Sequence, residues 1–225
     1  MLKTLTTAGS AAIVATTLAL SGASAATILT NGSFETGVPG NTPGLVNGAN
    51  YADMPTTGPD SDVWAGLNGW TLHSGPGIEV QTQRTLGLTP KDGNYYAELD
   101  SLANSVMYQT VRLNVGKYML SFWYSPQVAD ATTNGISYRL GGLVNGLVTG
   151  LTPGAVVGDW VEITAEYVVR KAGYYRLAFQ ARGRSDGVGG LLDNVAIASI
   201  PVPASGLVLL AGLGGLAALR RRKTA

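Results

Sequence analysis

The sequence predicts an all-β protein built as a single jelly-roll β-sandwich, and three observations support this prediction. The chain has 31 glycines, 10 prolines and only 13% charged residues, well below the roughly 25% of an average globular protein. Between residues 27 and 200, short apolar or alternating runs recur between clusters of Gly, Pro, Asn and Asp, a pattern typical of a sandwich. The same region lacks any long run with the periodicity of an amphipathic helix.

Seven segments carry the strand pattern: 94–101, 105–113, 117–126, 135–142, 159–169, 173–182 and 191–199. In the third and sixth segments the large apolar residues share one parity: Tyr118, Leu120, Phe122 and Tyr124, then Leu177, Phe179 and Ala181. Alternation with a period of two buries one face of a strand against a second sheet. We therefore expect roughly eight strands in one domain that spans residues 26–199.

The first 25 residues read as a secretory signal peptide. They contain one positive charge, Lys3, then an apolar run through Leu20 and the small residues Ala23–Ala25. This order predicts cleavage after Ala25 and export of the chain. The alternative is a short anchor that stays uncleaved.

The last 26 residues, 200–225, read as a second targeting segment. An apolar stretch runs from Leu207 to Leu219 and ends in a basic cluster, Arg220, Arg221, Arg222 and Lys223. Counted from Pro201, the uncharged stretch has about 19 residues, near the length of a transmembrane helix. The basic cluster should stay on the cytoplasmic side as a membrane stop. The alternative is a buried C-terminal helix of the globular domain.

This tail, "VPVPASGLVLLAGLGGLAALRRRK", resembles the VPLPA variant of the PEP-CTERM sorting signal of Gram-negative bacteria. The sorting motif would be Pro201, Val202, Pro203 and Ala204, with "PVPA" where "PLPA" or "PEP" is usual. The resemblance implies an exosortase-type processing enzyme as a partner. It also implies transient anchoring in the inner membrane, followed by a place at the cell surface or outside the cell.

The charge and the absence of cysteine exclude several classes of function. Disulfide bonds and Cys-ligated zinc are excluded because the chain has no cysteine. Without Lys3 and the four bases of the tail, 10 basic residues remain against 14 acidic ones. A mildly acidic domain with no basic stripe is a poor nucleic-acid binder; it suits a neutral ligand, a cation or a glycan.

Five stretches of the predicted domain occur in a recognisable order: "ILTNGSFETG", "GWTLHSGPGIEVQ", "DGNYYAELDS", "YQTVRLNVGKYMLSFWYSP" and "GRSDGVGGLLDNVAI". They resemble the galactose-binding-like β-sandwich, which includes carbohydrate-binding modules and a related cell-wall domain. The resemblance implies a noncatalytic polysaccharide binder. It also implies a structural Ca²⁺ near the first and last strands, where Glu35 and Asp193 match the acidic positions. Oxygen ligands of this kind suit Ca²⁺; the alternative is that both residues cap turns and face solvent.

Four residues are candidates for contact with a sugar. Residues 37–69 form a long segment rich in Gly, Pro, Asn and Asp, and long loops are often functional. Its Tyr51 and Trp64 offer flat rings for stacking. Glu98 and Asp100 share a strand parity and would hydrogen-bond sugar hydroxyls or line a solvated face. Carboxylates two apart on one strand do not flank a glycosidic bond as hydrolysis requires.

We therefore expect an exported, exosortase-sorted surface or matrix protein whose sandwich is a noncatalytic carbohydrate-binding or structural module. A secreted polysaccharide hydrolase and a purely structural protein without a ligand remain alternatives. His73, the single histidine, reads as a surface strand residue. The glycine-rich "GRSDGVGG" reads as a hairpin loop that leads into the last strand.

Overall fold

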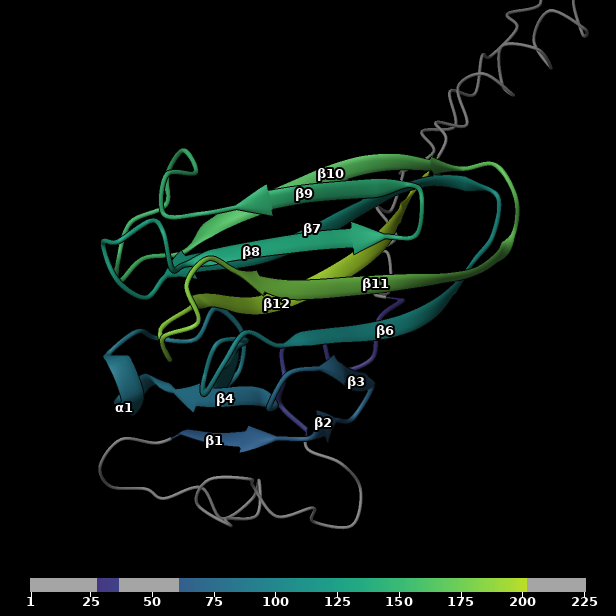
Figure 1. Ribbon diagram of the computed structural model, residues 1–225. Helices are drawn as coiled ribbons and strands as arrows, with labels where there is room; N and C mark the ends of the chain where they lie inside the picture. Colours follow the sequence, from purple (N-terminus) through teal and green to yellow (C-terminus); the bar gives the residue numbers. More distant parts are fainter. Residues whose placement is uncertain (1–27, 37–60, 202–225) are drawn as a thin grey trace, which may run out of the picture.

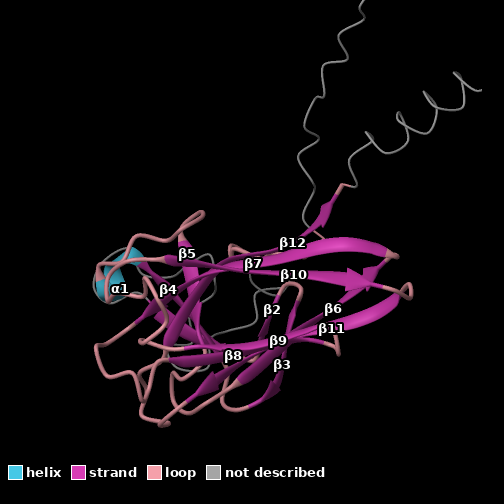
Figure 2. Ribbon diagram, turned by 90° about the horizontal axis from the view of Figure 1, so that it is seen from above, coloured by secondary structure: helices cyan, strands magenta, loops and turns pink. Residues whose placement is uncertain are grey.

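A computed structural model describes residues 28–36 and 61–201, which fold into two antiparallel β-sheets packed face to face (Figure 1; Figure 2). Each sheet contains six strands. The predicted all-β sandwich is confirmed for this part of the chain. It has twelve strands rather than the expected eight or so.

The first sheet has the spatial order β1-β4-β5-β12-β7-β10. Its strands are β1 (Ser61–Trp64), β4 (Ile78–Thr82), β5 (Tyr95–Glu98), β12 (Gly190–Ile200), β7 (Gly116–Pro126) and β10 (Val161–Val169). A single-turn helix, α1 (Gln83–Leu86), follows β4. The Thr82 hydroxyl caps its start and Gly87, in the left-handed conformation, ends it.

The second sheet has the spatial order β2-β3-β6-β11-β8-β9. Its strands are β2 (Gly66–Leu67), β3 (Trp70–Ser74), β6 (Val106–Leu113), β11 (Gly173–Arg182), β8 (Gly135–Leu140) and β9 (Val144–Val148). In Figure 1 the long strands of this sheet lie in front of β7, β10 and β12.

All seven predicted segments form strands, namely β5, β6, β7, β8, β10, β11 and β12. The sequence pattern missed β1, β2, β3, β4 and β9. Strand β9 shows why, because Gly146 interrupts its alternation. A Cβ on Gly146 would lie 2.3 Å from Cζ of Tyr138, so the missing side chain makes room for that ring. Glycine inside a strand often marks such a close approach.

Aromatic rings fill the space between the sheets. Phe122 of β7 and Phe179 of β11 meet across it with ring centroids 5.2 Å apart, and Trp70 of β3 lies 6.0 Å from Phe179. Large rings in such tilted or edge-on contact contribute both buried apolar area and a favourable ring geometry. The predicted inward parity is confirmed, since all of its members are buried: Tyr118, Leu120, Phe122, Tyr124, Leu177, Phe179 and Ala181.

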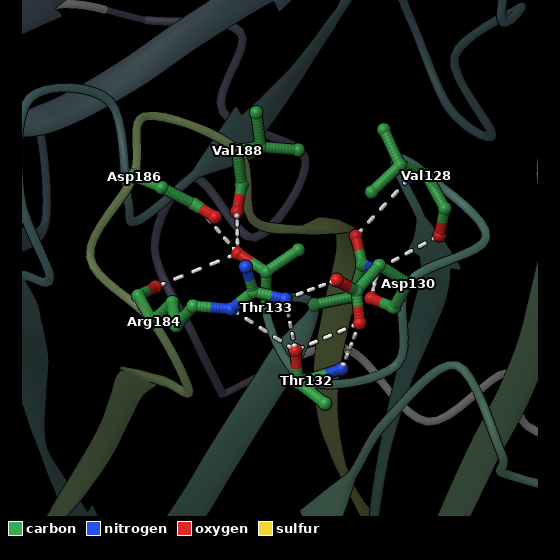
Figure 3. Close-up of polar contacts among 8 residues, drawn as sticks. Val128, Asp130, Thr132, Thr133, Arg184, Asp186 and Val188 are labelled. Atoms are coloured by element: carbon green, nitrogen blue, oxygen red, sulfur yellow. Dashed lines mark hydrogen bonds and ion pairs between the residues drawn. The ribbon is translucent and has the colours of Figure 1, made fainter.

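Two connections cross from one sheet to the other at the same end of the sandwich. Residues 127–134 join β7 to β8, and residues 183–189 join β11 to β12. The prediction that "GRSDGVGG" forms a hairpin is wrong, because β11 and β12 belong to different sheets. The two connections contact each other through polar side chains (Figure 3): the Thr133 hydroxyl donates toward the Val188 carbonyl oxygen, and Arg184 pairs with Asp130.

Asn134 holds the first of these connections together. Its side chain is buried, and Oδ1 accepts the backbone N–H groups of Gln127 and Val128. Nδ2 donates to the carbonyl oxygens of Val128 and Asp130. The amide therefore uses both donors and both acceptor positions, and a buried turn is satisfied by one side chain.

Residues 28–36 run beside β12. The backbone N–H of Ile28 donates to the carbonyl oxygen of Ile197 at 3.1 Å, and that of Val195 donates to Gly32 at 2.9 Å. A Cβ on Gly32 would lie 1.9 Å from the Val195 carbonyl oxygen, so the close approach requires glycine. The start and the end of the predicted domain therefore lie together, as expected.

The two predicted targeting segments, the signal peptide and the sorting tail, lie almost entirely outside the described residues. Pro201 is exposed directly after β12. The signal peptide (1–25), the rest of the sorting motif (Val202, Pro203 and Ala204) and the basic cluster fall outside. Within the described ranges, no helix has the length and hydropathy needed to cross a membrane. Export and sorting therefore stay predictions.

Replacing Phe179 by alanine should destabilise the fold by roughly 3–5 kcal/mol, because the change removes a buried ring and leaves a cavity between the sheets. Urea denaturation measures the loss. Tyr174→Ala is the matched control, since Tyr174 lies on the same strand but is 77% exposed; it should change stability by no more than about 0.5 kcal/mol. Similar losses in the two variants would contradict the assigned packing.

Candidate functional site

The outer face of the second sheet presents many polar side chains, together with aromatic rings and the planar guanidinium groups of arginines. Neighbouring residues of a strand point to opposite faces, so burial of Leu177 and Phe179 turns their neighbours on β11 outward. The outward set, taken strand by strand, is Thr71 and His73, then Val106, Tyr108, Thr110 and Arg112, then Ser137 and Arg139, then Asn145 and Leu147, then Tyr174, Arg176, Ala178, Gln180 and Arg182.

Two adjoining hollows cross this face. The first measures about 330 Å³ and is lined by His73, Val106, Tyr108, Arg139, Gly141, Arg176 and Ala178. The second measures about 530 Å³ and extends over β8 and β9 to Ser137, Asn145, Gln180 and Arg182. Because the two share Val106, Arg139 and Ala178, we treat them as one surface and call it the outer groove. Hollows of this size are typical of small-ligand sites.

Contacts between neighbours orient the side chains of the outer groove. The Arg176 guanidinium lies 4.1 Å from the ring centroid of Tyr108, and the His73 ring meets Tyr108 edge-on at 6.0 Å. Arg139 Nε donates to the Gly141 carbonyl oxygen at 2.9 Å, and Arg182 Nε donates to the Ser137 hydroxyl at 3.0 Å. Stacking and single hydrogen bonds thus position these groups on strands rather than on loops.

The structure corrects the placement of the predicted sugar contacts Glu98 and Asp100: Glu98 ends β5 of the first sheet, and Asp100 lies just beyond this strand. Glu98 is 1% exposed and Asp100 is 0% exposed. The connection 183–189 covers them: a Cβ on Gly189 would lie 3.0 Å from Glu98 Oε1, and the Asp186 backbone N–H donates to Asp100 at 3.2 Å. Neither carboxylate reaches an open surface.

Glu98 belongs to a small cluster of buried polar groups. Glu79 lies directly opposite it on β4, and Gln81 Nε2 donates to both carboxylates, at 2.6 Å to Glu98 and 3.1 Å to Glu79. Burial raises the pKa of Glu98 well above its usual range, and the neighbouring Glu79 carboxylate raises it further. Burial likewise raises the pKa of Asp100. Burial therefore disfavours the charged form of both carboxyls relative to their state in water.

Neither of the two aromatic residues predicted to stack on a sugar, Trp64 and Tyr51, is seen at an open surface of the described part of the chain. Trp64 lies in β1, is 1% exposed and belongs to the core between the sheets, so its ring offers no face to a sugar. Tyr51 lies outside the described residues. Among the described residues, the rings that line the outer groove are those of His73, Tyr108 and Tyr138, none of which was a predicted sugar contact.

The predicted calcium ligands Glu35 and Asp193 hold one turn from two sides. Both carboxylates accept backbone N–H groups there: Asp193 Oδ2 from Lys91 at 2.6 Å and Asp92 at 3.1 Å, and Glu35 Oε1 from Asn94 at 2.8 Å and Tyr95 at 2.9 Å. Burial raises the pKa of Asp193 to about 7, although the backbone N–H donors act in the opposite direction. These contacts fit the turn-capping part of the alternative. The part that turns both residues toward solvent is wrong for Asp193, which is 0% exposed.

These two residues alone do not make up a calcium shell. Ca²⁺ takes about six to eight oxygen ligands, whereas the oxygens of this pair already accept N–H donors. Among the described residues, no group of three or more His, Cys, Asp or Glu side chains is placed to hold a metal ion. Calcium at Glu35 and Asp193 stays a prediction.

The predicted sugar contacts were a loop segment and two carboxylates, whereas the side chains that line the outer groove belong to strands and none of them is acidic. A usable indication was present in the predicted strands. In 105–113 and 173–182, the parity opposite to the buried one contains Tyr108 and Arg112, then Arg176 and Gln180. What the sequence did not provide is the pairing of these strands with each other, which places the side chains together.

No protein family matches this chain, and no curated protein sequence matches it. Solved structures with a similar fold include TmCBM61 in complex with beta-1,4-galactotriose, with 16% identity, a TM-score of 0.49, and coverage of 78% of this chain and 99% of that one. The K1 cleaved adhesin domain of Lys-gingipain from Porphyromonas gingivalis W83 has 18% sequence identity and a TM-score of 0.43. The match covers 63% of this chain and 98% of that one. CBM35 from Paenibacillus barcinonensis has 20% sequence identity and a TM-score of 0.40, and the match covers 59% of this chain and 94% of that one. At this distance the likeness concerns the β-sandwich alone.

Replacing Glu98 by glutamine should reduce the loss of stability at alkaline pH. Because folding raises the pKa of Glu98 above its ordinary 4.5, the folded state holds this proton more tightly than the unfolded chain. The resulting stability is present below that ordinary value and is lost as the pH rises through the raised value. Melting temperatures at acidic and alkaline pH should therefore differ less in E98Q than in the wild type.

Glu166→Gln is the matched control, because Glu166 is an exposed glutamate on β10 of the same sheet. It should keep the pH dependence of the wild type. An E98Q variant whose melting temperature falls with pH as steeply as that of E166Q would contradict the assigned environment of Glu98.

Proposed function

We propose that this chain is an exported, noncatalytic carbohydrate-binding protein of the cell surface or extracellular matrix, and that the outer groove is its binding site. The observation that carries the proposal is the groove itself. It is an open hollow built on five neighbouring strands and lined by groups that hydrogen-bond and stack. The finer assignment of the fold as a galactose-binding-like jelly roll belongs to this proposal.

The chemistry of the outer groove supports binding of an extended, hydroxyl-rich ligand. Gln180 and Asn145 offer amide donors and acceptors, Ser137 offers a hydroxyl, and Arg139 offers several N–H donors. The surface is open at the sides rather than closed around one small molecule. A polymer could therefore lie across several strands and contact donors from each of them.

The predicted signal peptide and sorting tail support the location. Together they would deliver the sandwich across the inner membrane, where an exosortase-type enzyme would process the motif Pro201–Ala204. The polysaccharide would then be one that the protein meets outside the cell, in the matrix or at the surface. Both segments lie outside the described residues apart from Ile200 and Pro201, so this part rests on the sequence.

A glycan array and affinity electrophoresis with the purified protein test the proposed binding. Tyr108→Ala should weaken retention on a bound glycan by about tenfold, because it removes the ring that borders the groove and supports Arg176. Thr164→Ala, an exposed change on β10 of the opposite sheet, should leave retention unchanged. No retention on any polysaccharide, or equal losses in the two variants, would contradict the proposed site.

Calcium binding has its own test. The sequence predicts that calcium raises the melting temperature of chelator-treated protein and that Asp193→Asn abolishes the rise. Asp159→Asn, an exposed change in the segment before β10, should keep it. A wild-type melting temperature that is the same with calcium and with chelator would contradict a calcium site at Glu35 and Asp193 and leave both residues as holders of the 91–95 turn.

A further inference from the structure

We infer that the outer groove binds a polysaccharide that carries carboxylates, such as a chain of uronic acids. This inference rests on the proposed carbohydrate-binding function and names the class of its ligand. It follows from the distribution of charge between the two sheets and from the arrangement of the arginines on one of them.

The two sheets carry opposite charges. The strands of the second sheet contain four arginines and no Asp or Glu: Arg112, Arg139, Arg176 and Arg182. The strands of the first sheet contain six acidic residues and one lysine: Asp62, Glu79, Glu98, Glu162, Glu166, Asp193 and Lys117. All four arginines are exposed on the outward parity. The positive charge of the second sheet is therefore collected on the face that forms the outer groove.

Three of these arginines lie on a diagonal across neighbouring strands. Arg112 on β6 is opposite Tyr174 of β11, and Arg139 on β8 is opposite Ala178 of β11, with Arg176 between them on β11 itself. Each step therefore moves one strand across and two residues along. With a strand spacing of about 4.8 Å and a rise of about 3.4 Å per residue, neighbouring arginines are about 8 Å apart at their Cα atoms. A regular row of cations suits a polymer with a regularly repeated anion.

The arginines are oriented but not neutralised. Arg176 stacks on Tyr108, and Arg139 and Arg182 each use Nε in one hydrogen bond to a neutral oxygen. A guanidinium has five N–H donors, so most remain for a ligand. In the described part of the chain, none of the four arginines of this face forms a salt bridge with a carboxylate. Arg139, Arg176 and Arg182 line the outer groove, and Arg112 continues the row on β6 beyond that lining. Exposed cations without carboxylate partners, arranged in this way, suit an anionic ligand.

Carboxylates on a sugar chain fit this surface better than a nucleic acid does. A planar guanidinium binds a carboxylate through two parallel hydrogen bonds. The neutral groups Ser137, Asn145 and Gln180 suit the remaining hydroxyls. Single-stranded nucleic acids are bound through series of aromatic faces on which successive bases stack. Here the guanidinium of Arg176 already lies over the Tyr108 ring, which leaves the exposed Tyr174 as a single stacking face beside the arginines.

The decisive comparison uses polygalacturonate and its fully methyl-esterified form, which has the same backbone without the charge. The purified protein should bind polygalacturonate at least about tenfold more tightly than the ester in affinity electrophoresis or calorimetry. Raising the salt from about 50 to 500 mM should weaken binding to the acid form, because salt screens exposed charges, and should leave any binding to the ester unchanged.

A triple variant, R112Q/R139Q/R176Q, should lose about tenfold or more in affinity for polygalacturonate, since it removes three charge-assisted contacts. The matched control K117Q/R170Q/K171Q also removes three positive charges, but from exposed positions at the start of β7 and in the β10–β11 turn. It should bind like the wild type. Because the arginines are exposed, both variants should keep the melting temperature; the salt dependence of the wild type provides an independent reading if one does not fold.

Four results would overturn the inference. Equal binding of the acid and the ester, unaffected by the triple variant, would leave the proposed carbohydrate-binding function standing and remove the acidic ligand. Equal affinity for single-stranded DNA and for polygalacturonate would show a general polyanion site. Binding to neither form, with retention of another glycan on the array, would assign a different ligand class, while no glycan binding at all would contradict the proposed function itself.

Discussion

The aromatic rings packed between the two sheets decide which side of each strand faces the solvent. Phe122, Phe179 and Trp70 are buried together, and the side-chain period of a strand is two. A slip of one residue on β11 would bury Arg176 and expose Phe179. The outer groove is therefore a product of the core: the hydrophobic contact that stabilises the sandwich also directs the arginines outward.

The loops at one end of the sandwich serve a different purpose from the strands of the groove. Asn134 holds the β7–β8 connection together, and Thr133 joins it to the β11–β12 connection (Figure 3). Residues 183–189 of the second connection cover Glu98 and Asp100. The polar side chains of these two connections thus serve structure, while those on the outer face of the second sheet line the groove. A site on paired strands is held in place before a ligand arrives, so less conformational freedom is lost on binding.

The sequence predicted the strands better than the site, and for a physical reason. Alternation is local, so the inward faces of 117–126 and 173–182 could be assigned without knowledge of their partners. Register and sheet membership depend on distant contacts, so neither the crossing of 183–189 nor the meeting of Tyr108 with Arg176 could be read from the chain. Burial also depends on what covers a strand, which is why Glu98 and Trp64 were expected at a surface and lie inside.

The net charge of the predicted domain did not indicate the charge of the outer groove, because net charge sums the residues of both sheets. The predicted domain has more acidic than basic residues, which argued against a basic surface. In the structure, the acidic residues of the strands all belong to the first sheet, and two of them, Glu98 and Asp193, are buried beneath connections. The cross-strand neighbours of the groove arginines are neutral: Tyr174 opposite Arg112, Thr110 opposite Arg176, Ala178 opposite Arg139 and Gly135 opposite Arg182. Neighbouring cations without acidic partners repel one another, so an anionic ligand laid across them would relieve that repulsion and stabilise the fold that presents them.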